Sequence, residues 1–121
     1  ERMARCQQIV AEAVPELRIV SPIPDWFDVM PKGMSKAASL PILLDELDTT
    51  PDEVLVFGDA ANDLELFGAV PNSVAVANAI PEVAEAARWH VGDSAEEGVA
   101  DALFEIAVAA VTGGTPDFMK E

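Results

Sequence analysis

The strongest constraint on the fold is a short apolar run, "VLVF" at residues 54–57, that ends abruptly in Gly58-Asp59. The run has no polar residue at alternate positions, which is typical of a parallel strand that is buried on both faces. Gly58 lets the chain turn tightly and lets other groups approach its backbone. The sequence therefore predicts a buried strand followed at once by a turn that carries acidic side chains.

The order of the elements around this strand predicts an α/β domain. A helix is expected from its N-cap Ser35 to about residue 47, before the strand over 54–57. Further strands are expected over 73–77 and 89–91. Further helices are expected to begin at residues 62, 81 and 94, the last at the capping box Ser94-Ala95-Glu96-Glu97. Such alternation predicts right-handed crossovers and a parallel sheet with helices on both faces.

The first 31 residues do not follow this order. Apolar spacing predicts a helix over 2–13, and strands over 17–20 and 26–30 can pair as a hairpin whose turn is residues 21–25. Cys6 is the single cysteine, so no internal disulfide forms, and we expect it to pack on the apolar face of the helix. The chain should divide into an α+β module over 1–31, an α/β domain over 32–112 and a tail over 113–121.

The charge of the chain argues against some classes of partner. The formal net charge is −15, and only 7 of the 121 residues are Lys or Arg. Binding to a nucleic-acid backbone needs clustered basic residues, so we expect no nucleic-acid partner. No apolar stretch is long enough to span a membrane and no signal peptide is visible, which predicts a cytoplasmic protein without a membrane partner.

Acidic and amide side chains gather directly after the strand over 54–57. Ligands of open α/β sheets bind beyond the carboxyl ends of the strands, where Asp59 lies. Asp63 follows four residues later and can face back towards Asp59, so the two carboxylates could hold Mg²⁺, while Asn62 can hydrogen-bond without adding charge. Turns and helix N-termini favour acidic residues in any case, so the spacing also fits a purely structural role.

Lys36 favours the functional interpretation. A lysine at the start of a helix opposes the helix dipole, and an anion held between this lysine and a metal would explain its position. The alternative is an ordinary exposed lysine with a solvated head group. Lys32 is a weaker candidate for the same role.

Four segments resemble the C-terminal part of Cof-type phosphatases of the haloacid dehalogenase (HAD) superfamily. They occur in the family's order over nearly the whole chain: "DVMPKGMSKAASLPILLDEL", "VLVFGDAANDLELF", "VAVANAIPEVAEAA" and "EEGVADAL". The "GDxxND" element with an upstream "SK" is the most specific part. The resemblance implies the C-terminal half of a HAD-like Rossmannoid parallel sheet with helices on both faces. It also implies that residues 1–31 are the last helix and hairpin of a cap domain, which selects the substrate.

The resemblance implies roles for single residues. Lys36 would steady the transferring phosphate and the nucleophile, and Asp59 would be a catalytic residue that ligates Mg²⁺. Asp63 and Asn62 would complete the metal and phosphate environment, Asp63 as a metal ligand and Asn62 as a substrate-binding residue. Asn78, in "VANA", matches a loop asparagine beside the site and would also bind substrate.

The superfamily's nucleophile is missing from the chain. In the family it is the first Asp of an N-terminal DxD motif, whose second Asp is the general acid, and this sequence contains no Asp-x-Asp. The chain also begins with Glu1 rather than Met, so we expect the natural protein to be longer. A preceding segment or another chain would supply the DxD motif. Without that part, the strand over 54–57 is expected to have an unpaired edge.

These features predict a Mg²⁺-dependent phosphatase that acts through an aspartyl-phosphate on a small phosphorylated metabolite. The 121-residue chain alone is expected to be inactive. The alternative is a non-catalytic binding or regulatory module that retains the HAD fold. A phosphoacceptor signalling domain is a third candidate, but its acidic residues precede its lysine, whereas Lys36 precedes Asp59 here.

Overall fold

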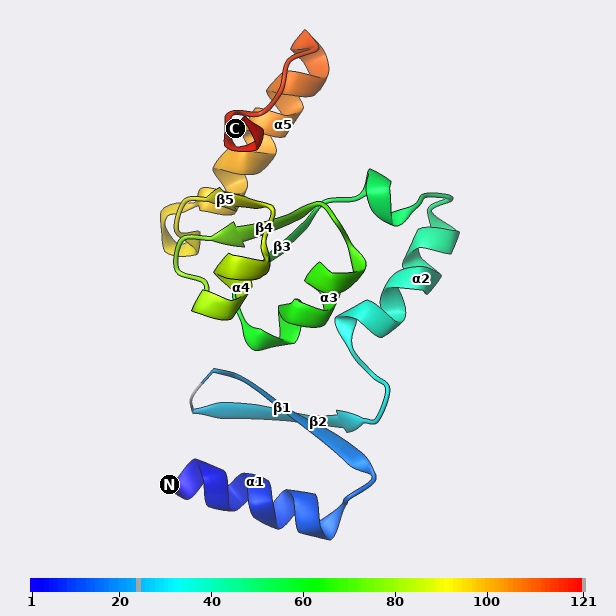
Figure 1. Ribbon diagram of the computed structural model, residues 1–121, viewed down its shortest axis with the longest axis vertical. Helices are drawn as coiled ribbons and strands as arrows, with labels where there is room; N and C mark the ends of the chain where they lie inside the picture. The colour runs from blue at the N-terminus through cyan, green and yellow to red at the C-terminus, as the bar shows by residue number, and fades with distance from the viewer. Residues whose placement is uncertain (24, 121) are drawn as a thin grey trace.

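The chain forms a helix and hairpin followed by a parallel sheet with its helices (Figure 1). The computed structural model describes residues 1–23 and 25–120. The N-terminal part contains helix α1 (Arg2–Ala13) and strands β1 (Leu17–Ile23) and β2 (Trp26–Pro31). Within the described ranges, no helix is long and apolar enough to cross a membrane.

Strands β1 and β2 pair antiparallel, from Leu17 opposite Pro31 to Ile23 opposite Trp26, which confirms the predicted hairpin. The predicted turn over 21–25 is too long, because β1 continues to Ile23 and part of that segment is strand. The Ser21 hydroxyl donates a hydrogen bond to the Trp26 carbonyl oxygen at 2.8 Å, which holds the strands together where their register shifts. Pro24, also within the predicted turn, lies outside the described residues.

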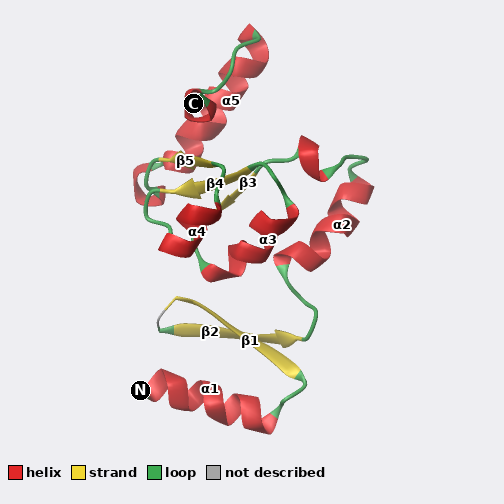
Figure 2. Cartoon of the chain, viewed as in Figure 1, coloured by secondary structure: helices red, strands yellow, loops and turns green. Residues whose placement is uncertain are grey.

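Helix α1 lies along the hairpin with much of its surface open to solvent (Figure 2). None of its twelve residues is buried. The expectation that Cys6 packs on the apolar face is wrong, because Cys6 is exposed. Ile9 is also 55% exposed, so the apolar face of this helix is largely uncovered.

Strands β3 (Val56–Gly58), β4 (Ser73–Val76) and β5 (Trp89–Val91) form the predicted parallel sheet, in the order β3-β4-β5. Every residue of the central strand β4 is buried. Strand β3 is shorter than expected, because pairing begins only where the Val56 N–H donates to the Asn72 carbonyl oxygen at 3.0 Å. Among the described strands β3 pairs with β4 alone, so its outer edge is open, as predicted.

Helices α3 (Leu64–Ala69) and α4 (Pro81–Ala86) pack on one face of the sheet, and α2 (Lys36–Glu46) packs beside α3. The core on this side consists of two clusters, one of Leu40, Leu44 and Val70 and one of Phe67, Ala75 and Val83. Partly buried Val56 contacts both clusters and joins them. Burial of these apolar side chains is the main favourable contribution to the stability of this part.

The C-terminal residues contact the sheet at β5. Helix α5 (Gly98–Thr112) begins near β5 and then extends away from the sheet (Figure 1). The predicted tail is partly structured, because residues 117–119 form a 3₁₀ turn. The Phe118 ring packs edge-on against the Trp89 ring, with 6.5 Å between the ring centroids. Glu121, the last residue of that tail, lies outside the described residues.

The predicted start of this last helix at Ser94 is wrong. Residues 94–96 form a 3₁₀ turn in which the Asp93 carboxylate accepts a hydrogen bond from the Ala95 N–H at 2.7 Å. Glu97 then adopts a left-handed conformation with φ of 63°, and α5 starts only at Gly98. Gly98 lies directly against Gly92, and a Cβ on it would be 2.0 Å from the Gly92 carbonyl oxygen. This close backbone contact leaves room only for glycine.

We predict opposite effects of alanine at two helical glycines. Gly98→Ala should lower the free energy of unfolding by about 1–3 kcal/mol, because its methyl group overlaps the Gly92 carbonyl. Gly68→Ala in α3 meets no atom within 4 Å and should raise that free energy by about 0.5–1 kcal/mol. Urea denaturation of the two variants and the parent chain measures both effects. Equal stabilities of the Gly98 and Gly68 variants would contradict the close contact.

Candidate active site

The carboxyl end of β3 positions the acidic residues. Strand β3 ends at Gly58, Asp59 follows it, and a 3₁₀ turn over residues 61–63 leads into α3. A Cβ on Gly58 would lie 2.7 Å from the Asp63 Cβ and 2.8 Å from the Phe67 ring. Glycine therefore lets the turn and α3 fold back against the strand end, which brings Asp63 next to the backbone of Asp59.

Asp63 is buried, with 2% of its surface exposed, and both of its carboxylate oxygens are engaged. Oδ2 accepts hydrogen bonds from the backbone N–H groups of Asp59 at 3.0 Å and Ala60 at 3.3 Å. Oδ1 accepts one from the Lys36 Nζ. Asp63 thus fixes the turn after β3 and holds Lys36 at the same time.

Burial of the Asp63 carboxyl acts to raise its pKa, because the charged form loses its hydration. The hydrogen bond from Lys36 and those from the two backbone N–H groups together outweigh this effect. The pKa of Asp63 is held below its ordinary value, so the side chain is ionised at neutral pH. Its charge then makes an ion pair with Lys36.

Lys36 is the first residue of α2, and the Ser35 hydroxyl caps this helix by accepting a hydrogen bond from the Ala38 N–H at 3.0 Å. The sequence predicts an anion between this lysine and a metal, which stays a prediction; in the structure the Asp63 carboxylate contacts the ammonium group of Lys36. About half of the Lys36 side chain, 52%, remains exposed. The ammonium group is therefore held in place and still accessible to a ligand.

The residues Lys36, Asp59 and Asp63 meet at one cavity of about 210 Å³. Asp59 is exposed, and its carboxylate has no hydrogen-bond or ion-pair partner in the part of the chain that the structure describes. The rest of the cavity wall comes from residues at the ends of β3, β4 and β5 and from α5: Phe57, Gly58, Val76, Ser94 and Val99. The structure thus brings together three of the five predicted site residues.

The donor atoms of this cavity fit Mg²⁺, because that ion prefers carboxylate oxygens and keeps several waters. Asp59 suits the role, since its oxygens have no partner in residues 1–23 and 25–120. Those same residues contain no group of three or more His, Cys, Asp or Glu that could hold a metal ion. Asp63 as a metal ligand stays a prediction, and its existing bonds favour a role in holding Lys36 and the turn.

The two predicted asparagines lie apart from this cavity's acidic centre. Asn62 lines a second cavity of about 420 Å³, which shares Lys36 with the first. Asn78 is paired with Ser94: its Nδ2 donates to the Ser94 Oγ at 2.9 Å, and its Oδ1 accepts from the Ser94 N–H at 3.1 Å. Asn78 therefore positions the loop that carries Ser94 to the first cavity. Its contact with substrate stays a prediction.

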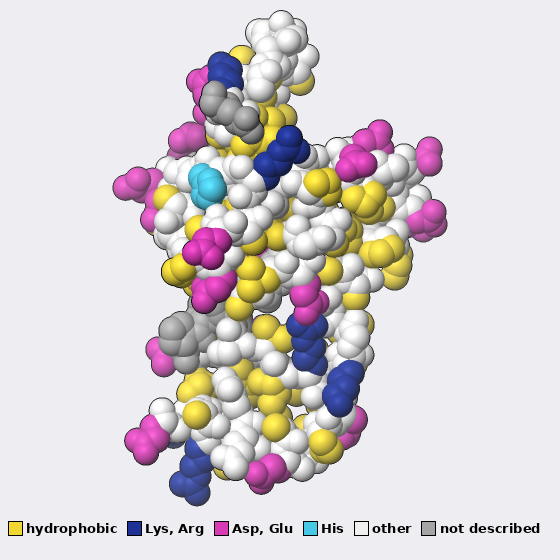
Figure 3. All heavy atoms as spheres, viewed as in Figure 1, with side chains coloured by type: hydrophobic (Ala, Val, Ile, Leu, Met, Phe, Trp, Pro, Cys, Tyr) yellow, Lys and Arg dark blue, Asp and Glu magenta, His cyan; other side chains and the backbone are white. Residues whose placement is uncertain are grey.

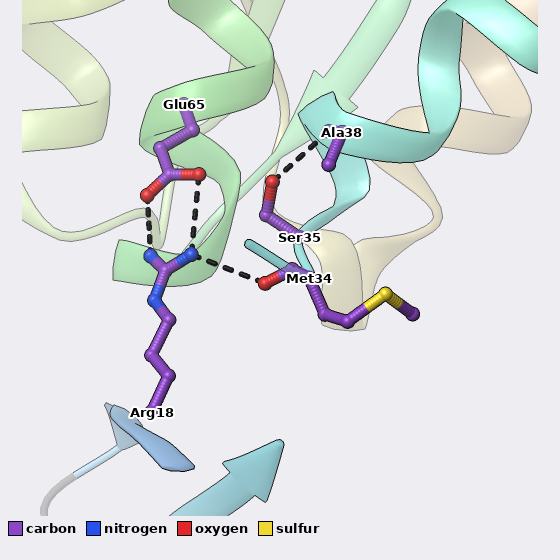
Figure 4. Close-up of polar contacts among 5 residues, drawn as sticks. All are labelled: Arg18, Met34, Ser35, Ala38 and Glu65. Atoms are coloured by element: carbon purple, nitrogen blue, oxygen red, sulfur yellow. Dashed lines mark hydrogen bonds and ion pairs between the residues drawn. The ribbon is translucent and has the colours of Figure 1, made fainter. Parts of the chain in front are cut away.

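Sequence reasoning missed two features of the site. Ser94, expected only as a helix cap, lines the first cavity, and its place just beyond the carboxyl end of β5 could have indicated this. The Arg18 guanidinium of β1 contacts the Glu65 carboxylate of α3 and the Met34 carbonyl oxygen (Figure 4). Residues 18 and 65 are 47 positions apart, and no local pattern indicates such a pair. Hydrogen bonds from Arg18 and Ser35 hold the pKa of Glu65 below its ordinary value.

The family of the chain follows from this geometry together with its sequence. The profile of the haloacid dehalogenase-like hydrolases matches residues 1–103. The chain belongs to this family. The predicted resemblance to the C-terminal part of a HAD phosphatase and the predicted α/β fold are therefore confirmed.

Two curated relatives illustrate the similarity. The phosphoglycolate phosphatase of Methanothermobacter thermautotrophicus is 41% identical over 71 residues, which cover 59% of this chain and 32% of that protein. The stress response protein YhaX of Bacillus subtilis is 31% identical over 91 residues, covering 75% of this chain and 32% of that protein. The chain thus spans about a third of the length of these two relatives.

Solved structures agree with the sequence comparison. SMU.1108c from Streptococcus mutans superposes with a TM-score of 0.75 at 28% identity, over 88% of this chain and 41% of that one. A haloacid dehalogenase-like hydrolase from Bacteroides thetaiotaomicron gives 0.70 at 30% identity, over 83% of this chain and 38% of that one. The chain corresponds to about two fifths of each of these proteins.

We predict that Asp63→Asn lowers the free energy of unfolding at pH 7 by about 1–3 kcal/mol, because it breaks a buried charge-assisted hydrogen bond. The folded-state pKa of Asp63 is depressed, so its stabilising effect is present above the unfolded pKa, about 4, and is lost as pH falls through the folded pKa. The difference between parent and variant should therefore shrink below about pH 4. Denaturant titrations at several pH values measure it.

Asp45→Asn is the matched control for this experiment. Asp45 is exposed on α2, and its carboxylate has no partner among the described residues. Its substitution should leave the stability almost unchanged over the whole pH range. An Asp63→Asn curve that runs parallel to the Asp45→Asn curve would contradict the structural role of Asp63.

Proposed function

We propose that the chain carries the lysine-bearing and metal-binding half of a Mg²⁺-dependent phosphatase site, which hydrolyses a small phosphorylated metabolite through an aspartyl-phosphate. The observation that carries this proposal is the meeting of Lys36, Asp59 and Asp63 in one cavity at the carboxyl end of β3. Phosphoryl transfer needs positive charge close to the phosphoryl group, because negative charge spreads over the phosphoryl oxygens in the transition state.

Each residue has a distinct task in this proposal. Lys36 directs positive charge into the cavity and binds a phosphoryl oxygen. The hydrogen bond to Asp63 holds the Lys36 side chain in this position. Asp59 holds the metal through oxygens that have no partner among the described residues. When bound, Mg²⁺ supplies charge neutralisation of the transferring group. Because this charge is in place before the reaction begins, little reorganisation is needed during it.

The relatives support phosphate ester hydrolysis. The protein that is 41% identical over 71 residues is named phosphoglycolate phosphatase, and an Enterobacter protein that is 37% identical over 59 residues is named HMP-PP phosphatase. Both names denote the removal of phosphate from a phosphorylated molecule. We therefore propose this reaction class, with the particular substrate chosen by parts of the protein beyond the 121 residues.

The nucleophile is proposed to come from a segment or chain that completes the sheet. The open edge of β3 offers unpaired backbone groups for another strand. Large apolar side chains of α2 and α5 are also exposed, which is typical of a surface that another part of the structure covers. These are Ile42, Leu43, Leu103, Phe104, Val108 and Val111, together with Leu47 directly after α2. Hydrophobic side chains are visible over both helices in Figure 3.

The 121-residue chain alone should not hydrolyse a generic aryl phosphate, with or without Mg²⁺, because it lacks the proposed nucleophile. Absorbance of the released phenolate measures this directly. Adding a natural N-terminal segment that contains a DxD motif should restore Mg²⁺-dependent turnover. Turnover by the chain alone would contradict the proposed mechanism. Absence of turnover after the N-terminal segment is added would favour a non-catalytic binding module.

Two substitutions in the completed enzyme test the roles of the cavity residues. Asp59→Ala should abolish Mg²⁺-dependent turnover, and Lys36→Ala should lower kcat by about 10²–10³-fold, since one charged donor to the transferring group is lost. Lys32→Ala is the matched control, because Lys32 makes no hydrogen bond or ion pair with the described residues. Steady-state kinetics compare the three. Equal rates for the Lys36 and Lys32 variants would remove Lys36 from the site.

A further inference from the structure

Arg18 of β1 binds the hairpin to the α/β part of the chain, as Figure 4 shows, beside the contacts that β1 makes with the turn over residues 61–63. We propose that the pair of Arg18 and Glu65 is a positioning device, which couples the placement of the hairpin to the placement of Lys36. This proposal deepens the proposed function and rests on it for its catalytic consequence. Its structural part can be tested without any activity.

The Arg18 guanidinium is held by three acceptor atoms. Its Nη1 donates to the Met34 carbonyl oxygen at 3.1 Å and to the Glu65 Oε2 at 3.4 Å, and its Nη2 donates to the Glu65 Oε1. Two N–H groups thus face two carboxylate oxygens, the fork geometry that gives arginine–carboxylate pairs their directional specificity. An isolated exposed ion pair contributes little, but this one also binds the main chain between the two parts.

The acceptors lie directly beside the residues of the candidate site. Met34 precedes Lys36 by two residues, and Glu65 follows Asp63 by two residues. Ser35 lies between Met34 and Lys36 and caps α2. The segments 34–36 and 63–65 are therefore joined twice, once by Lys36 with Asp63 and once through Arg18, which binds both the Met34 carbonyl and the Glu65 carboxylate. A shift of either segment changes both connections.

Arg18 and Lys36 also share the wall of the 420 Å³ cavity. The hairpin contributes Arg18, Val20 and Met30 to this cavity, and the α/β part of the chain contributes residues that include Lys36 and Asn62. A ligand that occupies it touches the hairpin and the neighbourhood of Lys36 together. The Arg18–Glu65 pair joins these two walls.

The segment that links the hairpin to α2 is short and exposed, so a side-chain contact between the two parts would restrict its motion. Only residues 32–35 connect β2 to α2, and Gly33 in this link has φ of +83°, a conformation that glycine adopts without strain. Lys32, Gly33 and Met34 are all exposed. Without the side-chain pair, this short exposed segment would have more freedom to move.

The test uses Glu65→Gln, which keeps the shape of the side chain and removes its charge. The control is Glu85→Gln, because Glu85 is exposed on α4 and has no partner among the described residues. Both variants retain every tryptic site of the parent chain. The first measurement is the rate of trypsin cleavage after Lys32. The second is the NMR signal of the Lys36 side chain.

We expect Glu65→Gln to speed cleavage after Lys32 by about two- to fivefold and to shift the Lys36 signal, while Glu85→Gln changes neither. Arg18→Lys should give intermediate values, because it keeps the charge and loses the fork. A merely stabilising contact would lower the melting temperature and leave the Lys36 signal unmoved, and that result would overturn the proposal. A positive result here without turnover in the completed enzyme would refute only the proposed function.

Discussion

The structure of the candidate site depends on the carboxylate of Asp63. One oxygen binds the two backbone N–H groups of the turn after β3, and the other binds a lysine from a separate helix. A buried carboxylate is costly unless it is paired and hydrogen-bonded, and all of its partners here come from the site itself. The strand end, the turn and the start of α2 are therefore held in one arrangement by a single side chain.

Much of the fold could be predicted from the sequence, because it follows from local patterns. The apolar run over 54–57 indicated a parallel strand, part of which is β3, and Ser35 indicated the start of α2 through its capping chemistry. The errors arose where distant residues decide the local structure. The close approach of Gly98 to Gly92 accompanies a start of α5 four residues later than Ser94, and the exposed face of α1 leaves Cys6 without the packing that its spacing implied.

Some residues of the candidate site could likewise be predicted from the sequence, and some of its contacts could not. Asp59 and Lys36 could be chosen from spacing and from an unfavourable charge, and the fold places them at one cavity. The partnership of Asn78 with Ser94 could not be predicted, because it joins two loops 16 residues apart. The ion pair of Arg18 with Glu65 joins the hairpin to α3, and no local sequence pattern indicates it.

The distribution of charge in the first cavity has a consequence for the sequence of ligand arrival. The positive charge of Lys36 is matched by Asp63, and Asp59 remains without a partner among the described residues, so this group of three carries one net negative charge. A phosphate ester that approached first would be repelled, whereas a cation is attracted. A divalent cation held by Asp59 would reverse the sign of this charge, and the cavity would then attract an anion.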